Sequence, residues 1–382
     1  MLAALIAQFR DFDVAEEALQ DAMIEAARSW PRDGTPSSGS AWLLTVARRR
    51  ALDRLRKSAR AKSAAVFDGD LSTGDETPET AYDIPDERLR LIFTCCHPAL
   101  SQEARVALTL RSLCGLAARD IARAFLVPDA TMNQRLTRAK AKIRHTGIPY
   151  RVPEMADLPA RLNAVLSVIY LIYNAGYAPL NPALSQEALR LCAVLHRLQP
   201  LPETAGLWAL MQLHSARDAS RLDRHGALVS LKDQDRSLWD RAAISDGKTR
   251  LLRALGQKRP GPYQIQAAIS ALHCEAQSWE NTDWPQILGL YEALYRHNPT
   301  PVVALNRAVA LAHTGAADAA LKALATLEDP LKNYQPYYAA RAELRAQLGQ
   351  TEAAKADFAH AIALTTAPEE QAFLRRKQQE LP

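Results

Sequence analysis

The sequence of 382 residues predicts an all-α protein made of several helical domains. Apolar residues recur with the helical spacing of about 3.6 residues, in a background dominated by Ala, Leu, Arg, Glu and Gln. No long segment alternates apolar and polar residues with the period of two that strands require, and hairpin signals are nearly absent. The last third repeats a pattern at a regular interval of about 34 residues, which is typical of stacked helical hairpins.

Charge is distributed unevenly along the chain, although the net charge is only +5. Residues 1–62 hold 11 basic and 8 acidic residues, and residues 88–151 hold 12 basic and 3 acidic residues. Residues 63–87 hold 8 acidic residues and no basic one, whereas the rest of the chain is balanced at 24 to 23. Two basic blocks separated by an acidic spacer predict an N-terminal part that binds a polyanion. The expected segments are a domain at 1–62, a linker at 63–87, a domain at 88–151, a helical extension at 152–258 and a repeat domain at 259–382.

The first block is expected to contain two amphipathic helices joined by a loop. Phe12–Trp30 is predicted to be the first helix. Pro31–Ser40 is rich in turn residues and is predicted to be the loop, with Ser40 as the N-cap of the second helix. The buried stripe of the first helix is expected to run near Val14, Ala18, Met23 and Trp30.

The second helix, Ser40–Lys62, is apolar at its start and basic at its end. From Arg48 to Lys62 it carries eight Lys or Arg and a single acid, Asp53. On a helix the two kinds of residue separate by angle, so an apolar side packs on the first helix while the basic side chains face outward. The residues expected on the packed side are Leu44, Ala47, Ala51, Leu52 and Leu55.

Residues 63–87 are acidic and rich in Gly, Ser, Thr and Pro, a composition that cannot bury a core. We therefore expect a flexible linker. Its negative charge would be repelled by nucleic acid, and its flexibility would let the two basic blocks reach separate sites.

The second block ends in two short helices joined by a tight turn. The predicted boundaries are Ala118–Phe125 for the first helix, Leu126–Ala130 for the turn and Thr131–Arg144 for the basic second helix. This is a helix-turn-helix pattern, in which the second helix enters the major groove of DNA. A solvated basic helix in an ordinary bundle is the alternative. We expect Ile121, Ala122, Val127, Leu136 and Ile143 in the core, and Asn133, Gln134, Arg135, Thr137 and Arg138 facing outward, as residue types that contact base edges and phosphates.

The five cysteines and one apolar run each have two interpretations. An odd cysteine count without a signal peptide indicates a reducing cytoplasm. The sequence TCCHP at Thr94–Pro98 offers three potential metal ligands, but zinc sites favour spaced pairs, so buried cysteines on a helix that ends at Pro98 are expected.

Leu162–Ala178 contains two Asn and is shorter than the roughly 20 residues that span a bilayer. It is predicted to be a buried helix, and no membrane partner is expected.

The C-terminal half is expected to be a helical extension followed by tetratricopeptide-like repeats. Leu213–Asp240 is dense in Arg and Asp, which indicates either a ligand pocket or, more commonly, ion pairs between helices at a domain interface. In the repeats, Gly315–Glu328 aligns with Gly349–Ile362, one repeat interval further along the chain. Such hairpins stack into a superhelix whose concave face binds a protein or peptide partner.

The order of these features resembles the extracytoplasmic-function group of bacterial RNA polymerase sigma factors. Region 2 of that family has a helix of the kind D-A-E-D…Q-E-x-F-x-x-A-W, followed by W-L-x-x-x-A-R-N-x-A-x-D-x-x-R. Region 4 ends in G-L-x-x-x-E-I-A-x-x-L-x-V-P-x-x-T-V-x-x-R-L-x-R-A-R. Residues that match or nearly match region 2 are Asp13, Ala15, Glu16, Glu17, Gln20, Asp21, Trp30, Trp42, Leu43, Ala47, Arg48, Arg49, Ala51, Asp53 and Arg56. Those for region 4 are Gly115, Leu116, Asp120, Ile121, Ala122, Val127, Pro128, Thr131, Met132, Arg135, Leu136, Arg138, Ala139 and Lys140.

The resemblance covers residues 1–151, and the tail is similar to the subgroup of this family that carries a long C-terminal extension. Two features depart from the family pattern. Arg49 stands where many relatives carry Asn, so their base preference at the −10 element is not transferred to this chain. The opening MLAALIAQF looks like the middle or end of the family's first helix, so that helix is expected to begin upstream of Met1.

The resemblance implies a sigma factor, with no catalytic residues and no cofactor, that binds core RNA polymerase and directs promoter recognition and transcription initiation. It implies contacts with the clamp and flap region of the core and with double- and single-stranded promoter DNA. It also implies that the extension modulates activity. We expect the extension to dock on the sigma domains within the chain, because the apolar run Leu162–Ala178 needs burial. The implied core-binding residues are Asp13, Glu16, Glu17, Gln20 and Asp21. The residues implied for the −10 element are Trp42, Arg48, Arg49, Arg50, Asp53, Arg54, Arg56 and Lys57, and those implied for the −35 element are Thr131, Asn133, Gln134, Arg135, Thr137, Arg138 and Lys140.

Two other classes of function stay open. A helix-turn-helix activator with a peptide- or ligand-sensing repeat domain shares the DNA-reading helix, but it has no use for the acidic helix and the linker. A scaffold would carry both basic blocks as solvated surface. An enzyme is disfavoured, because the sequence shows no Gly-rich phosphate loop, metal-ligand cluster or nucleophile motif.

Overall fold

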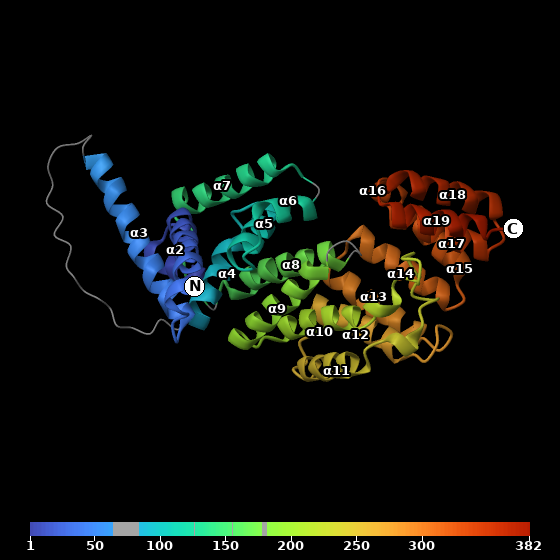
Figure 1. The fold of residues 1–382 in the computed structure, drawn as a ribbon. Helices are drawn as coiled ribbons and strands as arrows, with labels where there is room; N and C mark the ends of the chain where they lie inside the picture. Colours follow the sequence, from blue (N-terminus) through green and yellow to red (C-terminus); the bar gives the residue numbers. More distant parts are fainter. Residues whose placement is uncertain (64–83, 126, 155, 178–181) are drawn as a thin grey trace. The chain divides into compact units, whose positions relative to one another are not determined.

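The computed structural model of the chain describes residues 1–63, 84–125, 127–154, 156–177 and 182–382. Within these ranges the regular elements are helices, and the one extended pairing is an isolated bridge between Leu222 and Leu228 (Figure 1). The all-α prediction is therefore confirmed. The chain divides into two compact units, Met1–Leu198 and Gln199–Pro382. Most of the predicted linker, residues 64–83, lies outside the described residues.

The first unit begins with three helices, α1 (Leu2–Phe9), α2 (Phe12–Asp33) and α3 (Gly39–Ser63). α2 and α3 pack along a seam of alanines rather than along the large apolar residues expected from the sequence. Met23 of α2 is 48% exposed, and Leu52 and Leu55 of α3 are 42% and 37% exposed, so these three expectations were wrong. Short side chains occupy the seam because they let two helix backbones approach closely. The buried alanines are Ala15, Ala18, Ala22 and Ala26 of α2, and Ala47 and Ala51 of α3.

The turn between α2 and α3 is shorter than predicted. α2 continues through Pro31 to Asp33, because a proline in the last turn disturbs few helical hydrogen bonds. The N-cap of α3 is Ser38 rather than Ser40, since the Ser38 hydroxyl accepts a hydrogen bond from the Ala41 amide at 3.3 Å. The chain passes so close to Trp30 here that a Cβ on Gly39 would lie 3.0 Å from the indole ring.

Six further helices complete the described part of the first unit: α4 (Ile84–Cys95), α5 (Gln102–Ser112), α6 (Ala118–Ala124), α7 (Asp129–His145), α8 (Leu158–Tyr177) and α9 (Pro182–Leu198). α8 packs against α4 and α5. There the Arg161 guanidinium donates to the Phe93 carbonyl at 2.7 Å. The first compact unit therefore extends past the boundary at 151 and 152 that the sequence suggested between the second block and the extension.

Helix α8 contains most of the apolar run Leu162–Ala178, and it is buried, as predicted, on the face that includes Val165, Ile169 and Tyr173. Among the described residues, no helix has both the length and the apolar character needed to cross a membrane.

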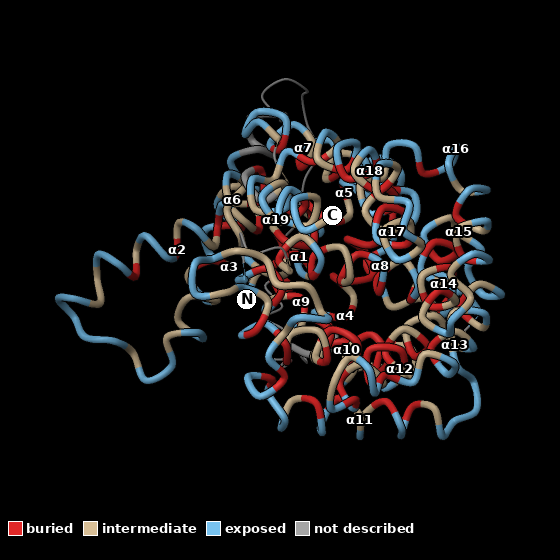
Figure 2. Tube along the Cα trace, turned by 90° about the vertical axis from the view of Figure 1, so that its right-hand side faces the viewer, coloured by how far each residue is buried: buried red, intermediate tan, exposed pale blue. Residues whose placement is uncertain are grey.

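The second unit opens with α10 (Pro202–Ser215), α11 (Arg241–Leu255), α12 (Pro262–Glu275) and α13 (Trp284–His297), and the short 3-10 helices η1 (Asp218–Ser220) and η2 (Arg236–Leu238) lie between α10 and α11. Figure 2 shows that α10 and α12 are buried over much of their length. In the Arg- and Asp-rich segment Leu213–Asp240, Arg236 contacts α12 through hydrogen bonds to backbone carbonyls. The Arg236 guanidinium donates to the carbonyls of His273 and Ala276 at 2.6 and 2.8 Å, at the C-terminal end of α12. This geometry complements the negative end of the helix dipole.

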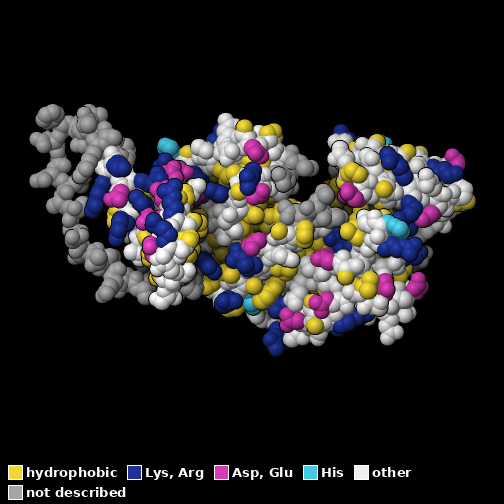
Figure 3. Space-filling model, in the orientation of Figure 1, with side chains coloured by type: hydrophobic (Ala, Val, Ile, Leu, Met, Phe, Trp, Pro, Cys, Tyr) yellow, Lys and Arg dark blue, Asp and Glu magenta, His cyan; other side chains and the backbone are white. Residues whose placement is uncertain are grey.

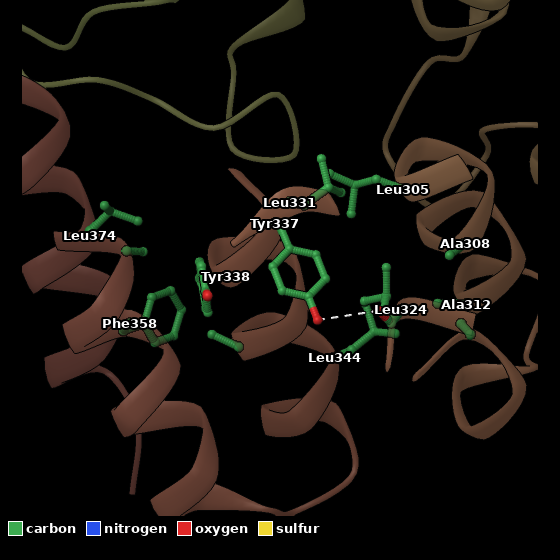
Figure 4. Close-up of a cluster of buried hydrophobic side chains, with 13 residues drawn as sticks. Leu305, Ala308, Ala312, Leu324, Leu331, Tyr337, Tyr338, Leu344, Phe358 and Leu374 are labelled. Atoms are coloured by element: carbon green, nitrogen blue, oxygen red, sulfur yellow. Dashed lines mark hydrogen bonds between the residues drawn. The ribbon is translucent and has the colours of Figure 1, made fainter. Parts of the chain in front are cut away.

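The repeats comprise α14 (Pro301–His313), α15 (Ala317–Ala325), the short α16 (Glu328–Leu331), α17 (Gln335–Gln347), α18 (Thr351–Leu364) and α19 (Pro368–Gln379). The predicted interval is confirmed, because the first helices of the two hairpins, α14 and α17, begin at 301 and 335, and the second helices, α15 and α18, begin at 317 and 351. Gly315 and Gly349 sit in the equivalent turns with φ of 94° and 72°, a backbone region that disfavours other residues. Figure 4 shows the core of these hairpins, where the Tyr337 hydroxyl donates to the Leu324 carbonyl at 3.2 Å.

Asp357 links α17 and α18 through a buried ion pair. Its carboxylate accepts hydrogen bonds from Arg341 Nε and Nη2 at 2.9 and 2.8 Å and from Arg345 Nη1 at 2.8 Å. Removal of one partner from such a pair leaves an unpaired buried charge, which costs about 3 kcal/mol. We predict that Asp357→Ala lowers the free energy of unfolding of α17 and α18 by about that amount. Hydrogen exchange measured in these two helices checks it.

Glu352→Ala is the matched control, because Glu352 is 90% exposed and has a single ion pair with Lys355 at 3.5 Å. An exposed pair of this kind contributes about 0.5 kcal/mol or less. Equal protection of α17 and α18 in the two variants would contradict the structural role given to Asp357.

Candidate nucleic-acid interface

The helix-turn-helix has the arrangement that the sequence predicted. α6 and α7 hold the expected core residues Ile121, Ala122, Leu136 and Ile143, which are all buried, whereas Val127 is half-buried. α7 begins at Asp129, two residues before the predicted start, and Leu126 of the predicted turn lies outside the described residues. Along α7 the outward residues form one exposed polar face, and these are Thr131, Asn133, Gln134, Thr137 and Arg138.

Two members of the set predicted for the −35 element differ from the others in exposure. Arg135 is half-buried and lines a cavity of about 310 Å³ with Met132 and Phe125. The Lys140 side chain is only 10% exposed, because its ammonium group lies 3.0 Å from carboxylate oxygens of both Asp13 and Glu16. In this conformation Lys140 neutralises acids of α2 and is not presented for a phosphate.

The predicted core-binding acids pair across the α2–α3 seam with the arginines predicted to bind the −10 element. Arg54 forms ion pairs with Glu17 and, at 2.7 Å, with Asp21. Arg50 pairs with Glu25 at 2.6 Å. The hydrogen bond that Arg54 donates to Asp21 raises the pKa of the Arg54 guanidinium, and the one that Arg50 donates to Glu25 raises the pKa of Arg50. In Figure 3 basic and acidic side chains alternate over α2 and α3.

The rest of the set predicted for the −10 element lies on the solvent side of α3. Arg49, Asp53, Arg56 and Lys57 are exposed, and Arg48 is half-buried. The sequence-based prediction that these basic residues contact phosphates stays a prediction, and the exposure of Arg49, Arg56 and Lys57 is compatible with it. Trp42 is half-buried and packs edge-on against Trp30, with ring centroids 5.6 Å apart, so it contributes to the apolar end of this domain.

Thr94, Cys95 and Cys96 are buried, whereas His97 is half-buried and Pro98 is exposed. Helix α4 ends at Cys95, three residues before the predicted end at Pro98. Cys95 and Cys96 are buried, as expected, and the Cys96 thiol lies 3.5 Å from the Thr109 hydroxyl. Burial raises the pKa of Cys96 to about 11 and that of Cys95 well above its ordinary value. In the part of the chain that the structure describes, no three His, Cys, Asp or Glu side chains gather as metal ligands would.

Sequence reasoning did not select four of the charged residues that hold this region together. Asp11 lies two residues before Asp13, Arg144 lies one turn past Lys140, and Glu25 lies one turn past Asp21. A charge pattern at helical spacing is the signal that would have identified these three. Arg111, which pairs with Glu16 at 3.4 Å, comes from a helix with no such signal.

Three family models match the chain. The model of sigma-70 region 2 matches residues 5–61, and the model of sigma-70 region 4 matches residues 90–143. A family of unknown function (DUF6596) matches residues 161–255, which run from α8 to α11. No solved structure matches the chain.

Similar proteins occur in three bacteria. An uncharacterised protein of Rhizobium meliloti is 43% identical over 387 aligned positions, which cover 98% of this chain and 91% of the relative. The RNA polymerase sigma-H factor of Pseudomonas aeruginosa is 32% identical over 155 positions, covering 37% of this chain and 78% of that factor. A probable ECF RNA polymerase sigma factor of Mycobacterium tuberculosis, SigI, is 27% identical over 180 positions, covering 44% of this chain and 61% of that factor.

Burial of the cysteines makes a prediction about their reactivity. A thiol with a pKa of about 11 is ionised in roughly one molecule in a thousand at pH 8, and only the thiolate attacks an alkylating reagent. We predict that Cys95 and Cys96 resist iodoacetamide at pH 8 in the folded protein and react fully in denaturant. Peptide mapping by mass spectrometry checks this. Rapid native labelling of Cys96 would contradict the packing of α4 on α5.

Proposed function

Because the chain belongs to the extracytoplasmic-function group of sigma-70 factors, we propose that it binds core RNA polymerase and directs initiation at a specific set of promoters. The observation that carries this proposal is the presence of two family regions in the right order, region 2 at 5–61 and region 4 at 90–143. A helix-turn-helix activator needs the second region alone, and a scaffold needs neither.

We assign the promoter contacts to the exposed charged and polar faces of two helices. On α3, Arg49, Arg56 and Lys57 would contact phosphates of the −10 element directly, and Arg50 and Arg54 would do so after leaving their carboxylate partners. Arg48, Asp53 and Trp42 complete this proposed surface. On α7, Asn133, Gln134, Thr137 and Arg138 have the exposure needed to reach base edges of the −35 element, with Thr131, Arg135 and Lys140 beside them.

We assign the contact with core polymerase to the acidic face of α2. Asp13, Glu17 and Gln20 are exposed there or nearly so, and Glu16 and Asp21 are half-buried. A row of carboxylates suits a basic surface such as we propose for the clamp of the largest subunit. The flap region would contact region 4. The protein would work in the cytoplasm and would lend specificity to the polymerase without covalent chemistry or a cofactor of its own.

We propose that the extension acts on the sigma regions through its first two helices. The packing of α8 on α4 and α5 supports this, since Arg161 bonds to the backbone of α4 and Arg190 of α9 donates to the Leu113 carbonyl at 3.5 Å. The repeated hairpins of the second unit would hold a protein or peptide partner.

Run-off transcription tests the function. The purified full chain, added to core polymerase without any other sigma factor, is expected to initiate from a matched promoter, and the initiation signal should fall steeply with salt because phosphate contacts release counterions. DNA binding at low salt without initiation would favour the activator. Absence of both core binding and DNA binding would favour the scaffold.

Truncation tests the extension. Cutting after Leu198, where the first compact unit ends, retains α8 and α9 and removes the repeats. We predict that the chain 1–198 still binds core polymerase but differs from the full chain in its rate of initiation in the same run-off assay. Equal rates at every salt concentration would show that the second unit plays no part in regulation.

A further inference from the structure

A long loop joins the short helices η1 and η2 of the second unit. It runs from residue 221 to residue 235, and its backbone pairing is the isolated bridge between Leu222 and Leu228. A loop of this length without a helix or strand of its own is uncommon in a compact domain and usually carries a function. We call residues 221–235 the η1–η2 loop.

The turn at the tip of the η1–η2 loop is ordered by its own hydrogen bonds. The Asp223 carboxylate accepts from the backbone amides of His225 and Ala227 at 2.8 and 2.9 Å. Gly226 closes the turn with φ of 79°, in a backbone region that other residues disfavour. These bonds lie within the loop, so they would be kept if the loop moved as one piece.

The η1–η2 loop contacts α19, far along the chain at the end of the repeats (Figure 1). The Arg376 guanidinium donates to the Leu228 carbonyl at 2.8 Å, and the Lys377 ammonium lies 3.6 Å from the Asp233 carboxylate. One of these bonds goes to the backbone and the other to an acidic side chain. Helix α19 therefore holds the loop in the way that a protein holds an extended peptide, through the main chain and one selected side chain.

Helices α17 and α14 face the same part of the loop. Glu343 of α17 is open to solvent but surrounded by protein, so loss of hydration raises the pKa of its carboxyl, whereas the nearby Lys377 and Lys232 act in the opposite direction. Burial lowers the pKa of His313 on α14, and Lys232 adds to this effect. Helices α14, α17 and α19 begin at 301, 335 and 368, close to the interval of the repeat. The loop thus lies along the face that successive repeat helices form.

We propose that this face of α14, α17 and α19 binds a peptide segment of a partner protein, and that the η1–η2 loop is its resident ligand, which the partner displaces. The partner segment would be extended and would carry aliphatic residues followed by a carboxylate, as Leu228 and Asp233 do in the loop. This inference rests on one part of the proposed function, the holding of a partner by the repeats, and it names the face and the chemistry.

The loop indicates which chemistry the face accepts. Leu228, Val229 and Leu231 are half-buried, although so short a loop has no core of its own, so the rest of the unit covers part of their aliphatic surface. Asp233 supplies the negative charge that Lys377 meets. Arg376 would be satisfied by any backbone carbonyl, so selectivity would come from the aliphatic residues and the acid.

The loop is held firmly at its ends and weakly in its middle. Just after it, the buried Arg236 donates to two carbonyls of α12, and Trp239 Nε1 donates to the Ser220 hydroxyl at 2.8 Å, which ties η2 to η1. Asp233, by contrast, is 51% exposed, and its pair with Lys377 is of the kind that is weak and screened by salt. A partner can therefore replace the middle of the loop while both ends stay in place.

Zero-length cross-linking tests whether the loop occupies the face in solution. A carbodiimide joins a lysine to a carboxylate when the two are in contact, so the full chain is expected to give an isopeptide between Lys377 and Asp233, located by mass spectrometry. Lys248 and Glu275, 2.6 Å apart in the same unit, supply an internal positive control. A control product without the product of Lys377 and Asp233 would overturn the proposal.

A fluorescent peptide that copies residues 221–235 tests recognition, with its binding to the full chain measured by fluorescence anisotropy. Asp233→Lys in the chain places two cations side by side and loosens the loop. We expect this variant to bind the peptide roughly fivefold more tightly than the original chain, because a larger fraction of the face is free.

Two further substitutions in the Asp233→Lys chain decide whether the peptide occupies the proposed face. Arg376→Ala removes the donor to the Leu228 carbonyl and should abolish the gain in affinity. Arg375→Ala is the matched control, with the same loss of charge at an exposed neighbour whose hydrogen bond is to Gln371 within α19. Its affinity should stay within twofold of the Asp233→Lys chain.

The outcomes separate this inference from the proposed function, because the test involves neither polymerase nor DNA. A gain with Asp233→Lys that Arg376→Ala removes and Arg375→Ala keeps supports the resident loop. Equal binding by the original and Asp233→Lys chains, no binding by either, or a gain that Arg376→Ala leaves unchanged overturns it, while run-off transcription still decides the sigma function. A chain that binds the peptide in this way but never initiates would overturn the sigma function and leave the face assigned.

Discussion

Small side chains along one edge of α2 set the distance at which α3 packs, and the charged surfaces of the first unit depend on that distance. Ala15, Ala18 and Ala22 are fully buried and face the equally buried Ala47 and Ala51 of α3. Alanine seams let helix axes approach to the short end of the usual range, about 8 Å. At that separation, carboxylates that flank the seam on α2 come within reach of arginines on α3, and Arg54 meets Glu17 and Asp21.

The same row of carboxylates on α2 forms ion pairs with two other helices of the first unit. On one side it pairs with α3, and at its N-terminal end with Lys140 and Arg144 of α7. Each base held in this way is a base withheld from phosphate. Most of the pairs are exposed, so the energies involved are small enough to be reversible.

The second unit is built from repeated hairpins that are joined by buried interactions. Its hairpins repeat at a constant interval, with turns closed by Gly315 and Gly349, and a buried pair between Arg341 and Asp357 joins adjacent helices. Arg341 pairs with a carboxylate inside the unit, and Arg236 donates to backbone carbonyls. The pair between Arg341 and Asp357 is buried, whereas the ion pairs of the first unit are mostly exposed.

The sequence by itself determined the helical class, the helix-turn-helix, the hairpin repeat and the family, because each depends on local periodicity or on motifs that lie close together in the chain. Ile121, Leu136 and the turn glycines were identified in this way. The spacing of apolar residues did not predict correctly which side chains of α2 and α3 are buried, because burial depends on which face of each helix packs against its neighbour. Met23 is exposed and Ala22 buried, because consecutive residues of a helix point in different directions and α2 packs on its alanine side. Only the tertiary structure decided that Lys140 pairs with Asp13 and Glu16. These residues lie far apart in the chain, and the sequence of one helix does not specify which distant charge will lie beside it.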